Sequence, residues 1–232
     1  RVRAAAQLRD ADRGVSEAVV IPARTALRIG ASFAVLTVGS VVMLLVAIPT
    51  LGLARRFYSD TLGRWIGWSV LRIAGIRYRT HGTPAHGGRQ TVYVANHTST
   101  LDGPILMALG LPRVRFFLSR SMRRVIPVAV IGTLVRMFWT VPQQYPEERR
   151  RIFERADRVL RRTGDSVYLS PEGKRMRNGE IGAFNKGAFH LATSLGAQII
   201  PIYISIPRDI DPGMGYHAKS GAADVYFLPP ID

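Results

Sequence analysis

The longest uncharged stretch of the chain is the strongest constraint on its fold. From Ile29 to Ala54, 26 consecutive residues carry no charged side chain, and arginines border this stretch on both sides. A helix needs about 20 apolar residues to cross the hydrocarbon core of a bilayer, so the stretch is long enough to span one. A cleaved signal peptide would have a shorter apolar core nearer the N-terminus. Because Pro49 and three glycines weaken the helix, insertion from one face and burial in a soluble core stay open as alternatives.

A second segment, residues 57–75, mixes tryptophans with arginines at spacings near a helical period. Trp65 and Trp68 alternate with Arg64 and Arg72. Such a composition is typical of a helix that lies at the headgroup level of a membrane, although the same rings could pack in a core. Because this segment follows the uncharged stretch directly, a helix at the membrane interface is the favoured interpretation.

From residue 76 onward, strand and helix patterns alternate, which predicts an α/β domain with a mixed sheet flanked by helices. The expected strands are 76–82, 91–95, 114–118, 137–141, 166–169, 198–204 and 223–228. The expected helices are 102–110, 120–135 in two pieces broken by Pro127, 146–162 and 184–195.

The composition limits the chemistry. A formal net charge of +16 favours anionic partners such as lipid headgroups or phosphorylated substrates, and nearly all of the basic excess is arginine. Arginine suits bidentate phosphate contacts, but skewed codon usage would give the same bias. No cysteine is present, which excludes disulfides, thiolate metal sites and a cysteine nucleophile. Nucleic acid is not expected as a partner, because the aromatic residues lie mostly in the apolar segments rather than among basic residues.

One stretch, residues 91–103, carries the clearest chemical signal. A β-branched run ends at Asn96 and His97, and a Thr/Ser-rich turn leads to Asp102. A neutral imidazole can take a proton from a hydroxyl when a carboxylate fixes its tautomer, so His97 would be the base and Asp102 the orienting group. The alternative is that Asp102 or Ser99 only caps the helix beginning near Gly103.

The same stretch resembles the N-H-x4-D signature of the glycerolipid acyltransferases, the family that includes lysophosphatidic acid acyltransferase. Further blocks of that family follow in order: FFLSRSMRRVIPVAVIGTL at 116–134, LSPEGKR at 169–175, GAFNKGAFHLA at 182–192 and IIPIYI at 199–204. The resemblance covers roughly residues 71–204. The composition predicts a polar lead-in at 1–28. The composition and the resemblance together predict a two-helix membrane anchor at 29–75, followed by a catalytic domain at 76–232.

The resemblance also implies the activity. His97 and Asp102 would catalyse transfer of a fatty acyl group from acyl-CoA or acyl carrier protein, as co-substrate, to a hydroxyl of a lysophospholipid. The enzyme would work at a membrane, on its cytoplasmic face, without a metal or other cofactor. A non-catalytic basic membrane protein of the same fold remains the alternative. Substrate binding is expected from Asn96, Ser99, Arg120, Glu172, Gly173, Lys174, Arg175 and Lys186, with Ser99 and backbone N–H groups near residue 102 stabilising the oxyanion.

Five further residues bear on this interpretation. The family that the chain resembles usually carries a basic residue just beyond the strand at 137–141, but this chain has Gln143 and Gln144 there, and a weaker phosphate contact would admit an acceptor other than lysophosphatidic acid. His81 and His86 could form a metal pair, but with no third ligand nearby they are interpreted as loop histidines. His190 falls in a helical pattern and is expected to be packed.

Overall fold

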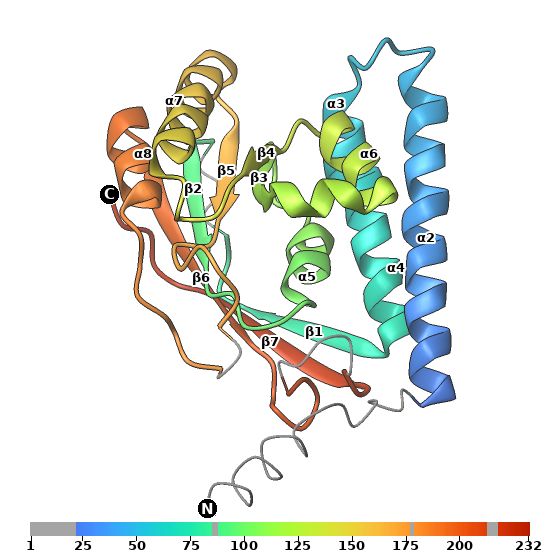
Figure 1. The fold of residues 1–232 in the computed structure, drawn as a ribbon. Coiled ribbons are helices and arrows are strands. Elements are labelled where there is room, and N and C mark those ends of the chain that lie inside the picture. Colours follow the sequence, from blue (N-terminus) through green and yellow to red (C-terminus); the bar gives the residue numbers. More distant parts are fainter. Residues whose placement is uncertain (1–21, 85–87, 177–178, 213–217) are drawn as a thin grey trace, which may run out of the picture.

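The computed structural model describes residues 22–84, 88–176, 179–212 and 218–232. Most of the predicted lead-in and His86 lie outside these residues. Within them, the chain builds one seven-stranded sheet with helices on both faces, and further helices stand beside it (Figure 1).

The sheet is mixed, as the sequence predicts. The strand order is β1-β7-β6-β2-β5-β3-β4, and the five strands from β6 to β4 are parallel, while β7 pairs antiparallel with β6 and parallel with β1. The strands are β1 (Ile76–His81), β2 (Thr91–Ala95), β3 (Val114–Ser119), β4 (Phe138–Thr140), β5 (Ser166–Leu169), β6 (Gln198–Ser205) and β7 (Gly221–Phe227). Each lies within two residues of its predicted bounds.

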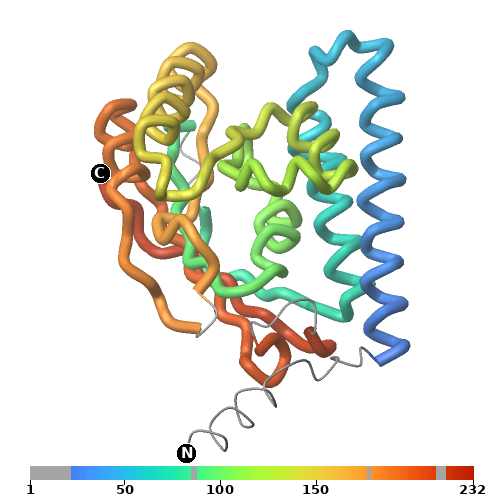
Figure 2. The backbone as a smooth tube through the Cα atoms, in the orientation of Figure 1, coloured from blue at the N-terminus to red at the C-terminus, as the bar shows by residue number. Residues whose placement is uncertain are grey.

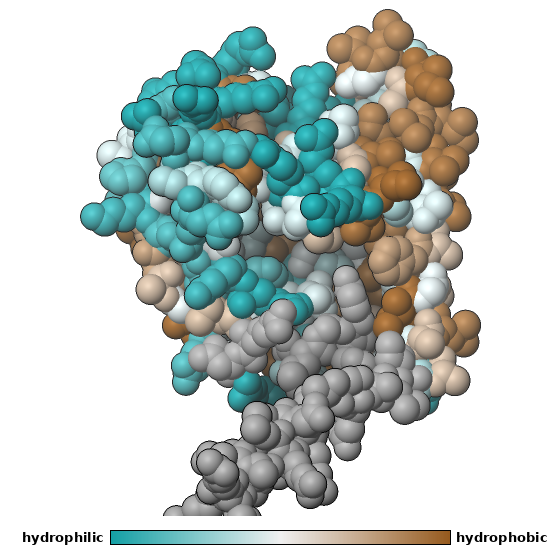
Figure 3. All heavy atoms as spheres, in the orientation of Figure 1, coloured by the Kyte–Doolittle hydropathy of each residue, from teal (hydrophilic) through white to brown (hydrophobic). Residues whose placement is uncertain are grey.

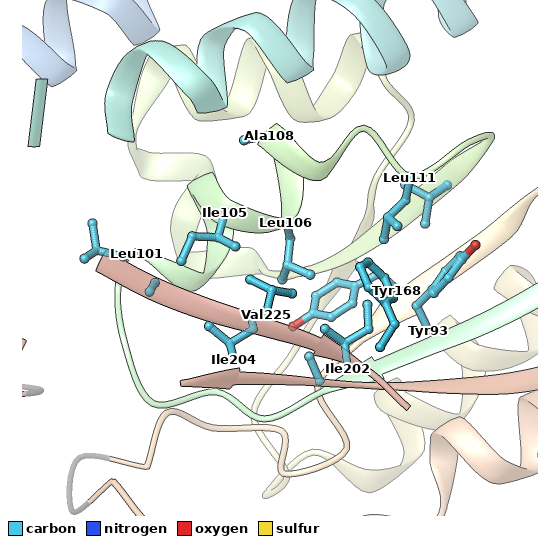
Figure 4. Packing of buried hydrophobic residues seen from close by; sticks show 14 of the residues in the cluster. Tyr93, Leu101, Ile105, Leu106, Ala108, Leu111, Tyr168, Ile202, Ile204 and Val225 are labelled. Carbon is cyan, nitrogen blue, oxygen red and sulfur yellow. The ribbon is translucent and has the colours of Figure 1, made fainter. Parts of the chain in front are cut away.

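The centre of the sheet is apolar on both faces. All five residues of β2 are buried, as expected for a parallel strand covered by helices on each side. Helix α5 (Asp102–Leu109) covers one face, where Ile105 and Leu106 meet Ile204 and Val225 (Figure 4). Helices α7 (Pro146–Thr163) and α8 (Gly187–Leu195) cover the other face.

A second helical layer lies beyond α5. It contains α2 (Ala23–Ala47), the short α3 (Arg55–Phe57), the π-helical η1 (Tyr58–Gly63), α4 (Arg64–Ala74), the 3-10 helix η2 (Arg120–Arg124) and α6 (Ile126–Leu134). Helices α2 and α4 run side by side in opposite directions (Figure 2). Met43, Ile66 and Ile131 belong to one buried cluster that joins α2, α4 and α6.

The surface of this layer is strongly apolar. Helix α2 is the one helix of the described residues that is long and apolar enough to cross a membrane, and its 25 residues extend about 37 Å. Leu27, Val38 and Leu45 are each more than half exposed, and apolar residues gather along this side of the molecule (Figure 3). Trp65 and Trp68 of α4 are also exposed. Because water would disfavour so large an apolar surface, the arrangement indicates membrane association.

Several predicted boundaries differ from the structure. Helix α2 begins at Ala23 instead of residue 29, because arginines at 24 and 28 are compatible with a helix even though they interrupt the uncharged stretch. Helix α8 starts at Gly187 instead of residue 184. The break in 120–135 falls at Val125, and Pro127 lies in the first turn of α6, where a missing N–H costs no hydrogen bond.

Gly67 sets how closely α4 approaches α5. A Cβ atom at this position would lie 2.7 Å from the carbonyl oxygen of Pro104 and 2.8 Å from the nitrogen of Ala108. Both of these atoms belong to the backbone of α5, so a side chain at 67 would force the two helices apart. The same helix α5 begins with Asp102, which couples the spacing of the two helices to the position of that carboxylate.

We therefore expect Gly67→Ala to lower the free energy of unfolding by about 1–3 kcal/mol, because the added methyl group overpacks the α4–α5 contact. Urea unfolding in detergent would measure the change. Gly30→Ala is the matched control, since nothing lies within 4 Å of a Cβ at Gly30 in α2. Equal effects of the two substitutions would contradict this account of Gly67.

Candidate functional site

The site forms where β2 ends. His97 follows the strand, and Asp102 is the first residue of α5. The Nδ1 atom of His97 lies 2.9 Å from Oδ2 of Asp102, and the Asp102 side chain is 1% exposed while that of His97 is 36% exposed. With Nδ1–H donating to the carboxylate, the Nε2 atom of His97 is left as the proton acceptor.

Asp102 also organises the turn before α5. Its Oδ2 atom accepts hydrogen bonds from the backbone N–H groups of Thr98 and Ser99, each at 2.9 Å. The alternative that Asp102 or Ser99 only caps the helix was wrong, because Leu101 is the N-cap residue of α5 and no side chain caps the helix. The Asp102 carboxylate instead holds the turn and contacts the imidazole. This arrangement fixes the loop between strand and helix around the histidine.

Two neighbours of His97 are engaged within the protein. The amide of Asn96 is buried, with Nδ2 donating to the carbonyl oxygen of Ile204 at 2.9 Å and Oδ1 accepting from its N–H at 2.8 Å. The buried hydroxyl of Ser99 is hydrogen-bonded to the carboxylate of Asp211 and accepts from the N–H of Leu101 at 2.9 Å. In this arrangement both side chains support the loop, and substrate contacts through them stay predictions.

The loop after β5 lies against His97, as expected for neighbouring parallel strands. The N–H of Met176 donates to the carbonyl oxygen of His97 at 2.7 Å. Glu172 is 1% exposed, and burial raises the pKa of its carboxyl group, although the backbone and charge of His97 oppose the shift. The structure therefore brings Glu172 into the electrostatic surroundings of His97 and Asp102.

The other predicted residues of this region lie nearer the surface. Gly173 adopts a left-handed conformation with φ of 68°, Lys174 is exposed and Arg175 is half-buried. Lys186, immediately before α8, is exposed. Lys174 and Arg175 supply positive charge in the loop after β5, and Lys186 supplies it before α8. Positive charge of this kind suits an anionic group of a substrate.

Gln143 occupies the place where a basic residue was expected. Its Nε2 atom donates to Oδ1 of Asn185 at 3.0 Å and to the carbonyl oxygen of Glu172 at 3.4 Å. Asn185 in turn donates to the carbonyl oxygens of Pro171 and Glu172. Gln143 and Asn185 therefore support the loop that carries Glu172.

Arg120, at the start of η2, is paired with Glu148 of α7.

Asn185 and Asp211 were missed in the sequence because their roles depend on partners far away in the chain. His190 is exposed on α8, so the expectation that it is packed was wrong. In a helix of nine residues, its position falls outside the buried stripe of Ala188, Leu191 and Ala192.

His81, at the end of β1, makes a structural contact of its own. It stacks on Tyr226 with ring centroids 4.4 Å apart, and its Nε2 atom lies 2.8 Å from Oδ1 of Asp224. Both partners belong to the neighbouring strand β7, so this histidine joins the two strands at the sheet edge.

Comparisons with known proteins identify relatives by sequence. A family model described as Acyltransferase matches residues 75–205. The chain is 31% identical over 150 residues to the chloroplastic 1-acyl-sn-glycerol-3-phosphate acyltransferase of Arabidopsis thaliana, which covers 64% of this chain and 41% of that protein. It is 30% identical over 144 residues to the human 1-acyl-sn-glycerol-3-phosphate acyltransferase beta, covering 60% of this chain and 51% of that protein. The chain thus spans about half or less of the length of these two relatives.

The fold has a counterpart among solved structures. The crystal structure of the 1-acyl-sn-glycerophosphate acyltransferase of Thermotoga maritima matches with a TM-score of 0.59 and 18% sequence identity, covering 86% of each chain. At this identity the similarity establishes a shared fold. Because the family model matches more than half of the residues, including the whole stretch from His97 to Glu172, the chain belongs to the acyltransferase family.

Proposed function

We propose that the protein transfers a fatty acyl group from an acyl thioester, acyl-CoA or acyl carrier protein, to a hydroxyl of a lysophospholipid. The first acceptor to consider is 1-acylglycerol-3-phosphate, since both sequence relatives are named as acyltransferases of this substrate. The observation that carries the proposal is the 2.9 Å contact between Nδ1 of His97 and the buried Asp102 carboxylate, which leaves Nε2 as a base.

In the proposed reaction, Nε2 of His97 takes the proton of the acceptor hydroxyl as its oxygen attacks the thioester carbonyl. The Asp102 carboxylate stabilises the imidazolium that forms. The negative charge on the carbonyl oxygen is assigned to backbone N–H groups at the start of α5, because the Ser99 hydroxyl is already bonded to Asp211. The C–S bond then breaks, and the thiolate receives the proton from His97.

The acceptor's headgroup is assigned to the basic side chains near the loop after β5. Lys174, Arg175 and Lys186 supply positive charge there, which suits a phosphate. Gln143 contributes hydrogen bonds without charge on the same loop. Because residue 143 is uncharged, the site has a lower preference for an acceptor with a free phosphate. We therefore propose that lysophospholipids with larger headgroups also serve as acceptors.

The helical layer gives this chemistry its location. The exposed apolar face of α2 would keep the enzyme beside its lipid substrate and product. We place the catalytic site on the cytoplasmic side of the membrane, because both candidate donors are soluble thioesters that reach the site from water.

His97→Ala should abolish acyl transfer while the unfolding midpoint stays near that of the wild type, because the side chain is partly exposed and acts as the base. Transfer of labelled palmitate from palmitoyl-CoA and from palmitoyl carrier protein to a panel of lysolipids would measure this. His190→Ala, which removes an exposed histidine from α8, is the control and should retain activity. Near-normal turnover of His97→Ala would rule out the assignment of the base.

Gln143→Arg should raise the preference for 1-acylglycerol-3-phosphate over lysophosphatidylcholine by about tenfold, because a charged hydrogen bond to a phosphate contributes about 1.5–3 kcal/mol. The ratio of kcat/KM for the two acceptors is the readout. Gln144→Arg adds the same charge at the adjacent exposed residue and should change the ratio much less. If both variants shift the ratio equally, position 143 does not contact the headgroup.

Glu172→Gln tests the raised pKa of this buried carboxyl. A raised pKa means that the folded protein favours the neutral form, so wild-type stability falls as pH rises from the ordinary value of 4.5 through the folded pKa. The glutamine variant should lack this fall, and its stability relative to the wild type should increase across that window. Urea unfolding of both proteins at a series of pH values would measure the difference. A difference that does not vary with pH would contradict the raised pKa.

A further inference from the structure

A cavity lined by arginines lies at the amino-terminal ends of the parallel strands, whereas His97 follows the carboxyl-terminal end of β2. Its volume is about 520 Å³, within the range of roughly 300–1,000 Å³ that is typical of small-molecule sites. It is lined by Gly52, Leu53, Ala54, Arg55, Arg56, Arg115, Arg136, Thr163 and Asp165. Arg115 and Asp165 lie at the starts of β3 and β5, whereas His97 follows the end of the parallel strand β2. The cavity therefore lies apart from the proposed reaction.

The cavity carries a large excess of positive charge. Four arginines line it against one acidic residue, Asp165, which is buried. Both carboxylate oxygens of Asp165 are already bonded, Oδ1 to Nη2 of Arg55 at 2.6 Å and Oδ2 to Nε of Arg115 at 2.8 Å. The negative charge of Asp165 offsets one of the four arginines, so three net positive charges remain around the cavity. Arg56 and Arg136, which are both exposed, contribute two of them.

One guanidinium nitrogen in this group lacks an acceptor. Among the described residues, Nη1 of Arg55 is buried and has no hydrogen-bond partner, while Nη2 of the same side chain is bonded to Asp165. Leaving a buried charged donor unpaired costs about 1–3 kcal/mol or more. An anion with several acceptor oxygens would satisfy Arg55 and the neighbouring guanidinium groups together.

One wall of the cavity belongs to the turn that follows α2. Gly52, Leu53 and Ala54 line the cavity, and this turn exposes Leu51 by 83% and Leu53 by 81%. The apolar surface of α2 continues into the turn (Figure 3). A basic cavity that adjoins an exposed apolar turn matches a molecule with an anionic group at the end of acyl chains.

We propose that this cavity binds the phosphate group of a membrane lipid. The shared chemistry is a phosphate or phosphodiester bound by Arg55, Arg56 and Arg136, and the adjoining apolar turn favours a lipid headgroup over free phosphate. The bound headgroup would fix the depth and tilt of the domain at the membrane surface. The inference does not depend on the acyl-transfer reaction, because it involves different residues at a different edge of the sheet.

The test compares binding of two probes to the full chain in detergent by titration calorimetry: dihexanoyl phosphatidylglycerol below its micelle concentration, and inorganic phosphate. The variant is Arg56→Gln/Arg136→Gln, which removes two exposed guanidinium groups and leaves the pairs of Asp165 intact. The control is Arg151→Gln/Arg155→Gln, which removes the same charge from exposed positions on α7. Thermal unfolding without ligand verifies that each variant is folded. If the glutamine variant does not fold, Arg56→Lys/Arg136→Lys, which keeps both charges, replaces it in the comparison.

The wild type and the α7 control should bind dihexanoyl phosphatidylglycerol equally, and the Arg56/Arg136 variant at least about tenfold more weakly. The lysine variant, which loses the guanidinium fork, should bind with intermediate affinity. Because the catalytic edge could bind the same probe, the difference between variants is the readout. Weaker binding of inorganic phosphate than of the lipid supports a headgroup site, whereas equal affinities identify free phosphate as the ligand and overturn the lipid assignment. Equal binding by all variants, or none by the wild type, overturns the proposal.

Discussion

The candidate site depends on the hydrogen bonds that the buried carboxylate of Asp102 accepts. Its Oδ2 atom meets the imidazole of His97 and two backbone N–H groups of the preceding turn. Loops at the ends of parallel strands need such an internal support, because no ladder partner holds them. A single oxygen therefore sets both the conformation of the loop and the tautomer of the histidine. Removing it would disturb folding and chemistry together.

The position of Asp102 depends in turn on the helical layers. Helix α5 packs its apolar side chains on the sheet, and its backbone lies close to α4 because residue 67 has no side chain. Helix α4 belongs to the same buried cluster as α2, the helix that carries the exposed apolar surface. A continuous set of packed contacts thus connects the exposed apolar surface of α2 with the loop that carries His97 and Asp102. This packing keeps the distance between the candidate site and the exposed apolar surface of α2 constant.

Much of the fold could be predicted because its signals are local. The run from Thr91 to Ala95 consists mainly of β-branched and aromatic residues, and the helix from Pro146 to Thr163 has a regular apolar stripe, so both were located to within a residue. The start of α2 was misplaced because charge marks the edge of a hydrocarbon core and not the end of a helix. The contact between His97 and Asp102 could be predicted because a Thr/Ser-rich turn lies between them in the sequence and brings the two side chains together.

The remaining features were beyond sequence reasoning because they join distant segments. The structural bonds of Asn96 depend on Ile204, and Asp165 gathers arginines from α3 and β3. No periodicity or spacing in the chain relates these positions. The likeness to known enzymes identified residues by their chemistry, but it could not tell which of them contact each other and which face outward.

The central place of β2 in the sheet also has a consequence for the order of synthesis. Its neighbours β5 and β6 come later in the chain, and the amide of Asn96 pairs with a residue 108 positions further on. While the ribosome has not yet released β6, the strand that carries His97 lacks one partner and the loop lacks its anchor. The apolar helix α2, in contrast, precedes β2 in the chain and ends at Ala47, long before β6 begins. The apolar surface of α2 can therefore leave the ribosome well before the partners that hold the loop of His97.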